Sequence, residues 1–120
     1  FLMGDQITII GCGYVGLTMA AFLSGGDRKV ICFDIDENKI LALNNKKNPI
    51  YEPGLDELLF NEGLGSHLTF TNNIVDSMSS DIFFICVPTP TDASGHCDVR
   101  YIFKAFDAIL NVEPSARSKI

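Results

Sequence analysis

Apolar residues gather in short continuous runs along the chain, and these runs alternate with segments of helical periodicity. Four runs predict strands: Gln6–Ile10, Lys29–Asp34, Leu68–Thr71 and Asp81–Val87. The runs are mostly continuous in apolar residues and do not show the regular alternation of strands with one solvated face. The pattern therefore predicts strands that are buried on both faces, as in a parallel sheet.

Segments with helical patterns lie between and after these strands. The expected helices are Tyr14–Leu23, a helix capped by Asp36 that runs through Leu43, Asp56–Asn61, and a helix from an N-cap at Asp98 to about Leu110. Alternating strands and helices are typical of the α/β class, and here they predict a Rossmann-like, doubly wound parallel sheet.

The remaining segments complete the expected organisation. Asn44–Gly54 contains two prolines and several asparagines, which favour a structured loop. Ser118–Ile120 has the character of the first residues of a further strand. A length of 120 residues suits a single domain. We therefore expect one α/β domain over residues 1–120, with a sheet that is truncated before it is complete.

Charge and composition narrow the classes of partner. The net charge of −6 argues against a nucleic-acid partner, because there is no basic patch to release counterions. An anionic ligand must then be held by local groups. No apolar run approaches the roughly 20 residues that span a bilayer, so no membrane partner is expected.

The cysteine pattern points to a reduced compartment. Cys12, Cys32, Cys86 and Cys97 have neither C-x-x-C nor metal-ligand spacing. Cys32 and Cys86 lie in apolar runs and are predicted to be small buried residues. A cytoplasmic location is the simplest fit to this usage.

A glycine motif stands between the first strand and the first helix. Gly11-x-Gly13-x-x-Gly16 has the strand–turn–helix context that a dinucleotide site requires. Gly11 permits a tight turn, Gly13 lets the backbone approach a pyrophosphate, and Gly16 lets the helix pack closely on the strand. The amides around Tyr14 and Val15 would face the phosphates at the positive end of the helix dipole. The alternative is a glycine-rich turn without a ligand.

Asp34 ends the second strand, 18 residues after Gly16. At that position a carboxylate accepts hydrogen bonds from the adenosine ribose hydroxyls. It also repels a 2′-phosphate, and no arginine follows it, so NAD is favoured over NADP. The alternative is an ordinary acid at a strand end. Lys39 reaches a phosphate or ribose in one interpretation and is a solvated helix lysine in the other.

The segment Pro88–Thr91 follows the fourth strand, which is expected to pair with the first at the switch point where ligands bind. Its prolines stiffen the loop, and the hydroxyls of Thr89 and Thr91 are candidates to face the cofactor. The alternative is a rigid turn with solvated hydroxyls. His67 and His96 stand in polar surroundings and are expected at the surface. We expect no catalytic residue and no metal site in this chain.

Several segments together resemble one family. In chain order they are GCGYVGL, FDID followed by Lys39, NPIYEPGLDELL, FFICVPTPT and GHCDVRYI. The chain resembles the N-terminal NAD-binding domain of the UDP-glucose/GDP-mannose dehydrogenase family over nearly its whole length. The YEPGL and VPTP segments are more specific than the glycine motif. They also argue against other dehydrogenases of this fold, such as hydroxyacid or 6-phosphogluconate enzymes.

The resemblance implies an activity for a longer parent enzyme. The family oxidises a nucleotide-sugar primary alcohol to the carboxylate in two NAD-dependent steps, through a cysteine thiohemiacetal. UDP-glucose, giving UDP-glucuronate, is the default substrate, with UDP-N-acetyl-mannosamine and GDP-mannose as alternatives. The parent is expected to be a homo-oligomer.

The resemblance also assigns residues and shows what is missing. It implies cofactor roles for Gly11 to Gly16, Asp34, Lys39 and the Pro88 to Thr91 loop. The family's serine-threonine-valine loop and its catalytic glutamate, lysine and cysteine have no counterpart here. The chain is therefore expected to be an inactive N-terminal fragment that at most binds NAD. The alternative is a stand-alone NAD-binding or regulatory module without chemistry.

Overall fold

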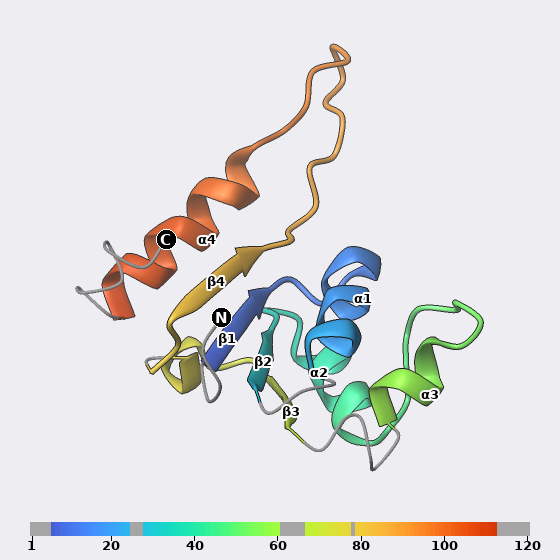
Figure 1. The fold of residues 1–120 in the computed structure, drawn as a ribbon. Coiled ribbons are helices and arrows are strands. Elements are labelled where there is room, and N and C mark those ends of the chain that lie inside the picture. Colours follow the sequence, from blue (N-terminus) through green and yellow to red (C-terminus); the bar gives the residue numbers. More distant parts are fainter. Residues whose placement is uncertain (1–5, 25–27, 61–66, 78, 113–120) are drawn as a thin grey trace.

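A four-stranded parallel sheet forms the centre of the computed structural model, which describes residues 6–24, 28–60, 67–77 and 79–112 (Figure 1). The strands are β1 (Gln6–Ile10), β2 (Lys29–Phe33), β3 (Leu68–Thr71) and β4 (Ile82–Ile85). Their order is β3-β2-β1-β4, and every neighbouring pair is parallel. The strand order reverses between β1 and β4, which places the switch point where the sequence predicts it.

Helices cover both faces of this sheet. They are α1 (Tyr14–Leu23), α2 (Glu37–Asn44), α3 (Leu55–Phe60), the 3₁₀ helix η1 (Ile74–Ser77) and α4 (Arg100–Val112). Figure 1 shows α1, α2 and α3 together on one side of the strands and α4 beside β4 on the other. The predicted α/β class and doubly wound arrangement are confirmed.

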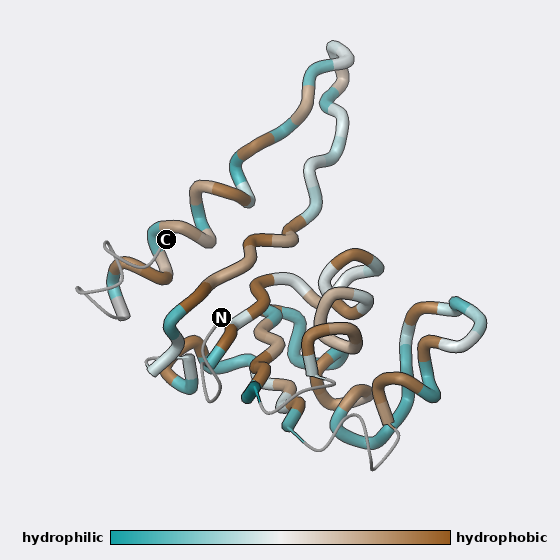
Figure 2. Tube along the Cα trace, in the orientation of Figure 1, coloured by the Kyte–Doolittle hydropathy of each residue, from teal (hydrophilic) through white to brown (hydrophobic). Residues whose placement is uncertain are grey.

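The strands divide their side chains between two apolar clusters. Ile7, Ile9, Val30 and Cys32 pack with residues of α1, α2 and α3. Ile10 and Phe33 pack on the opposite face with Ala105 and Ile109 of α4. Successive residues of a strand point to opposite faces, so a run that is apolar throughout supplies both clusters. Figure 2 shows the apolar colour along the central strands.

Most predicted bounds agree with the structure. β1, α1 and β3 have the predicted ends, and Asp36 caps α2 by accepting a hydrogen bond from the Lys39 amide at 3.2 Å. The final strand is shorter than the predicted Asp81–Val87, because its ladder ends where β1 ends, at the pair of Ile10 with Ile85. β2 likewise ends at Phe33, one residue before the prediction.

The predicted N-cap at Asp98 is wrong by one residue. Helix α4 begins at Arg100, and the carbonyl of Val99 accepts hydrogen bonds from the amides of Ile102 and Phe103. Asp98 lies just before the capping position, where its carboxylate contacts both the backbone and the guanidinium of Arg100.

Other predictions fall partly or wholly outside the described residues. The predicted end of α3 at Asn61 and the predicted strand start at Ser118–Ile120 are of this kind. The sequence did not predict η1. Within the described ranges, no helix is both long enough and apolar enough to cross a membrane.

Candidate cofactor site

The turn from β1 into α1 lies directly against the chain that leaves β4. The Gly11 amide donates to the Phe33 carbonyl at 2.8 Å, and Gly11 has a φ of 105°. A Cβ on Gly11 would lie 2.5 Å from the carbonyl oxygen of Cys86. Both the positive φ and the neighbouring backbone therefore require glycine at this position.

The other two motif glycines serve different needs. A Cβ on Gly16 would overlap the carbonyl oxygen of Gly11 and lie 3.4 Å from the Ile9 side chain, so the absence of a side chain lets α1 pack on the turn. A Cβ on Gly13 would meet no atom within 4 Å, and Gly13 has a φ of −82°. The fold itself does not require glycine at position 13. An open approach to the backbone there fits a bound pyrophosphate.

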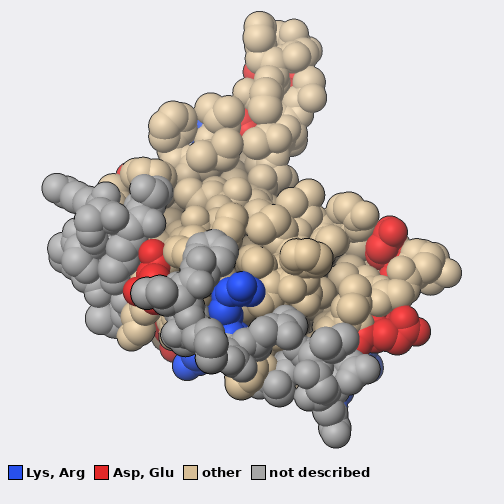
Figure 3. Space-filling view, viewed as in Figure 1, with Lys and Arg blue, Asp and Glu red and all other residues tan. Residues whose placement is uncertain are grey.

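The first turn of α1 offers backbone donors to that open space. The amides of Tyr14, Val15 and Gly16 have no acceptor within the helix, as at any helix start, and the N-cap Gly13 supplies no side-chain acceptor. The side chains of Tyr14 and Val15 are exposed. Figure 3 shows mostly uncharged residues on the face that it presents between β4 and α1. Local amides and the helix dipole are therefore the groups that favour an anion here.

Asp34 stands next to the glycine turn with its carboxylate held from several sides. Its side chain is only 13% exposed, and Oδ2 accepts from the Cys12 amide at 2.9 Å. Oδ1 accepts from the Asp36 amide at 2.9 Å. The Lys39 ammonium lies 3.5 Å from Oδ2. The structure thus brings Asp34, Lys39 and the glycine turn together, and we call Gly11–Gly16 with Asp34 and Lys39 the cofactor cradle.

Two backbone hydrogen-bond donors of the cradle were not predicted from the sequence. The backbone amides of Cys12 and Asp36 orient the Asp34 carboxylate, but backbone groups leave no residue-type signal. For Asp36 a signal exists, because an aspartate often accepts a hydrogen bond from the amide two residues on. For Cys12 only the turn geometry reveals the contact.

The segment that follows β4 reaches the cradle at its base and then leaves it. A Cβ on Gly11 would lie 3.1 Å from the Val87 amide nitrogen, so the strand end adjoins the turn. Residues 88–98, the arm, then project away from the sheet and return to α4 (Figure 1). Pro88, Thr89 and Thr91 are exposed, and Thr91 pairs with Cys97 in an antiparallel bridge. The contacts seen for Thr89 and Thr91 lie within the arm.

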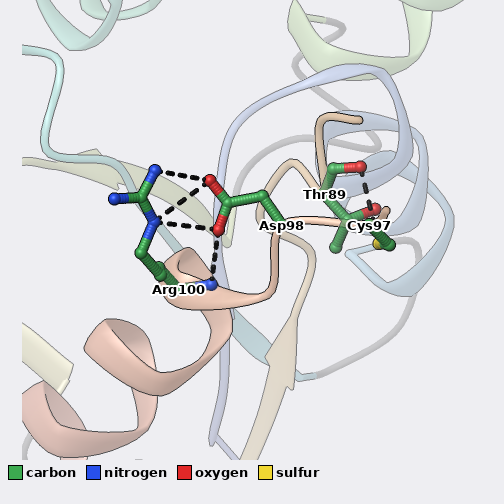
Figure 4. Close-up of polar contacts among 4 residues, drawn as sticks. All are labelled: Thr89, Cys97, Asp98 and Arg100. Carbon is green, nitrogen blue, oxygen red and sulfur yellow. Dashed lines mark hydrogen bonds and ion pairs between the residues drawn. The ribbon is translucent and has the colours of Figure 1, made fainter. Parts of the chain in front are cut away.

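Polar contacts close the base of the arm (Figure 4). The Cys97 thiol lies 3.7 Å from the Thr89 carbonyl oxygen, and Asp98 pairs with Arg100 at 2.7 Å. Hydrogen bonds from the Arg100 side chain and backbone lower the pKa of Asp98 to about 2. A charged pair, rather than an N-cap side chain, therefore holds the junction between the arm and α4.

The cysteines beside the cradle are structural in character. Cys32 is buried, as the sequence predicts, and Cys12 is buried as well. The pKa of Cys32 is raised by its hydrogen bond with Cys12 and by burial. Cys86 was predicted to be buried but is half-buried, because it follows β4, which has only β1 beside it among the described strands. Burial also raises the pKa of Cys86. The raised pKa values keep the thiols of Cys32 and Cys86 protonated and poorly nucleophilic.

In the described part of the chain, the cradle contains no histidine and no metal-binding group. His67 and His96 are exposed, as the sequence predicts. Among the residues that the structure describes, no three histidine, cysteine or acidic side chains form a group that holds a metal.

Comparison with known proteins decides the family. A profile described as "UDP-glucose/GDP-mannose dehydrogenase family, NAD binding domain" matches residues 5–117. The chain belongs to this family. Its cofactor is therefore NAD, and the open face of Gly13 beside the α1 amides suits it. The family predicted from the GCGYVGL, YEPGL and VPTP segments is confirmed.

Similar proteins share this part of the chain. UDP-glucose 6-dehydrogenase TuaD of Bacillus subtilis is 44% identical over 105 residues, which are 87% of this chain and 23% of the relative. The solved GDP-mannose dehydrogenase of Pseudomonas aeruginosa has a TM-score of 0.81 and 37% identity, covering 88% of this chain and 24% of that one. The UDP-N-acetyl-mannosamine dehydrogenase Cap5O of Staphylococcus aureus has a TM-score of 0.80 and 32% identity, covering 90% and 26%. The chain thus spans about a quarter of the length of these relatives.

Proposed function

We propose that residues 1–120 are the N-terminal NAD-binding domain of a nucleotide-sugar dehydrogenase. The observation that carries this proposal is the cofactor cradle of this chain, which belongs to the family. The cradle combines a glycine turn with an open Gly13, first-turn amides without a helical acceptor, and the Asp34 carboxylate beside them. Each of these groups meets a different part of a dinucleotide. Bound NAD supplies the hydride acceptor for the oxidation.

Each part of the cradle has a role in binding. The amides of Tyr14, Val15 and Gly16 hold the pyrophosphate at the start of α1. Asp34 accepts hydrogen bonds from the adenosine ribose hydroxyls, and Lys39 contacts the same region from α2.

The segment Pro88–Thr91 follows Val87, whose amide nitrogen adjoins the Gly11 turn. It contributes the Thr89 and Thr91 hydroxyls and the rigid Pro88 to the cofactor side of the switch point. Support for this assignment comes from its position after β4.

The reaction we propose for the full-length protein is oxidation of the C6 alcohol of UDP-glucose to the carboxylate of UDP-glucuronate, in two NAD-dependent steps. The relative named UDP-glucose 6-dehydrogenase TuaD, at 44% identity, supports this sugar, and the solved GDP-mannose and UDP-N-acetyl-mannosamine enzymes keep those two sugars as alternatives. The groups that read the sugar and perform the chemistry lie outside residues 1–120. We propose that these residues alone bind NAD without turnover, and that the full-length enzyme is a cytoplasmic homo-oligomer.

The test follows NADH formation by the full-length protein. NAD is mixed separately with UDP-glucose, UDP-N-acetyl-mannosamine and GDP-mannose, and the expected result is two NADH for each UDP-glucose consumed. The same yield with another sugar would correct the substrate. NAD binding without NADH from any of them would favour the alternative of a binding or regulatory module. Failure to bind NAD would overturn the proposal.

A further inference from the structure

Helix α1 contains no charged residue on any of its faces. Its inner residues, among them Leu17 and Ala20, are buried against the sheet in the apolar cluster. Val15, Thr18 and Phe22 follow one another at spacings of three and four residues, so they share the outer face, and all three are exposed. Phe22 is 84% exposed. A helix that is apolar all round is typical of one buried on every side.

The other long helices turn charged or polar residues toward solvent. Helix α4 exposes Arg100 and Lys104, and α2 exposes Glu37. Leu41 of α2 is 60% exposed, but its exposed neighbours on that helix face, Asn38 and Asn45, are polar. Single exposed apolar residues of this kind are common at protein surfaces. An uncharged helix with an apolar outer face is not, so solvent does not account for the sequence of α1.

The polar atom in the middle of this face is already satisfied. The Thr18 hydroxyl donates to the Tyr14 carbonyl of the same helix at 2.7 Å. A hydroxyl that is bonded back to its own helix can be covered without leaving an unpaired polar group. The outer face of α1 can therefore be buried at little cost.

We propose that an amphipathic helix from the part of the full-length chain that follows residue 120 packs on the outer face of α1. This inference rests on the proposed function, in which residues 1–120 are one domain of a longer enzyme. The chain spans 23% of TuaD and 24% of the GDP-mannose dehydrogenase, so most of such a protein lies outside these residues. The groups that read the sugar must also approach NAD, whose pyrophosphate lies at the start of α1, and this brings another part of the chain beside the helix.

Charge beside α1 favours this occupant over a second copy of the same face. Helix α3 lies next to α1 (Figure 1), and Glu52, Asp56 and Glu57 are exposed on α3 and the loop before it. Figure 3 shows acidic side chains on that side of the molecule and uncharged residues over α1. A symmetric contact between two copies would bring two such acidic edges together. A helix with apolar residues toward α1 and lysine or arginine toward α3 complements both surfaces.

The first experiment measures thiol labelling by iodoacetamide in the native full-length protein, read at each peptide by mass spectrometry. The variants are Thr18→Cys and Phe22→Cys on the outer face, with Leu41→Cys as the matched control on α2. The two introduced thiols on α1 are expected to react at least about tenfold more slowly than the control, because labelling of a covered site requires local opening. Phe22 lies about 12 Å along the helix from Tyr14, at 1.5 Å per residue, so NAD affinity is expected to stay at the wild-type value in Phe22→Cys.

A second experiment identifies what covers the face. Phe22→p-benzoylphenylalanine keeps an aromatic side chain and forms a crosslink on irradiation. The expected product runs at the mass of one polypeptide on a denaturing gel and joins position 22 to a peptide from beyond residue 120.

Each remaining outcome contradicts a particular statement. Equal labelling rates at positions 18, 22 and 41 would show that α1 is not covered. A crosslinked product of twice the polypeptide mass would assign the face to a second copy and overturn the proposed occupant. A folded wild type that binds no NAD overturns the proposed function instead, and the labelling rates still decide whether α1 is covered.

Discussion

At the scale of single residues, the three motif glycines differ in what surrounds them. Gly11 combines a φ of 105° with backbone contact to Cys86, and Gly16 lacks a Cβ because the Gly11 carbonyl fills that space. Gly13 faces open space. The first two are therefore needed by the fold, whereas the fold leaves position 13 free, and we propose that glycine there serves ligand binding.

This difference predicts opposite phenotypes for two identical substitutions. Gly16→Ala is expected to lower the free energy of unfolding by about 1–3 kcal/mol, because the overlap outweighs the helix propensity of alanine. Gly13→Ala is expected to cost less than about 1 kcal/mol, the scale of alanine at an N-cap. Its NAD affinity nevertheless falls by more than about tenfold, since the new methyl group stands where the pyrophosphate approaches the backbone.

Urea unfolding and calorimetry check both variants. Equal stability losses in the two would contradict the distinction between fold glycine and ligand glycine. Unchanged NAD affinity in Gly13→Ala would remove this residue from the site.

At the scale of elements, α2 follows β2 and carries Lys39 of the cradle. One narrow apolar face packs this helix on the core. Ile40 and Leu43 are buried in the cluster beneath α1, whereas Leu41 is 60% exposed. Asp36 begins the helix, and Lys39 extends from its first turn toward Asp34. Packing of that face therefore sets the position of Lys39.

Two leucines on α2 make a matched pair. Leu43→Ala is expected to destabilise the protein by about 2–5 kcal/mol, because a fully buried side chain leaves a cavity. Leu41→Ala is expected to change stability by no more than about 0.5 kcal/mol, as for most exposed positions. Denaturant unfolding monitored by circular dichroism measures both, and similar losses would contradict the assigned face of α2.

The start of α4 predicts a pH effect at the same scale. The pKa of Asp98 is about 2 when folded, below its ordinary 3.8, because Arg100 donates to the carboxylate. A lowered folded pKa contributes stability that is complete above the ordinary pKa and is lost as the pH falls through the folded one.

The free energy of unfolding should therefore fall between about pH 4 and pH 2 more steeply in the wild type than in Asp98→Asn. Urea titrations at a series of pH values give the comparison. Parallel pH profiles for the two proteins would show that the pair does not contribute to stability.

At the scale of the whole molecule, the apolar clusters on both faces of the sheet include residues at or next to the cradle. The cluster beneath α1 and α2 includes Cys12 of the turn, and the cluster beneath α4 includes Ile10 at the end of β1. The net charge of −6 does not help to hold an anionic cofactor. Binding therefore depends on fixed local donors, and bound cofactor should stabilise the fold that positions them.

Linkage makes that coupling measurable. At a free NAD concentration of 100 times Kd, the unfolding free energy should rise by about 2.7 kcal/mol. Asp34→Ala removes a hydrogen-bond acceptor for the ribose, and a tenfold higher Kd would reduce this gain at the same concentration to about 1.4 kcal/mol. Unfolding with and without NAD measures the gain, and the same increase in both proteins would exclude Asp34 from binding.

The sequence by itself determined the α/β class, the bounds of β1, α1 and β3, and the family. Those features are local: apolar runs, glycine spacing and capping residues act over a few neighbours. Only the tertiary structure decided that β4 stops with β1, that α4 begins at Arg100 rather than Val99, and that the amides of Cys12 and Asp36 join Lys39 around one carboxylate. Such features depend on pairing and on backbone donors that converge from separate segments, and neither leaves a mark in residue type.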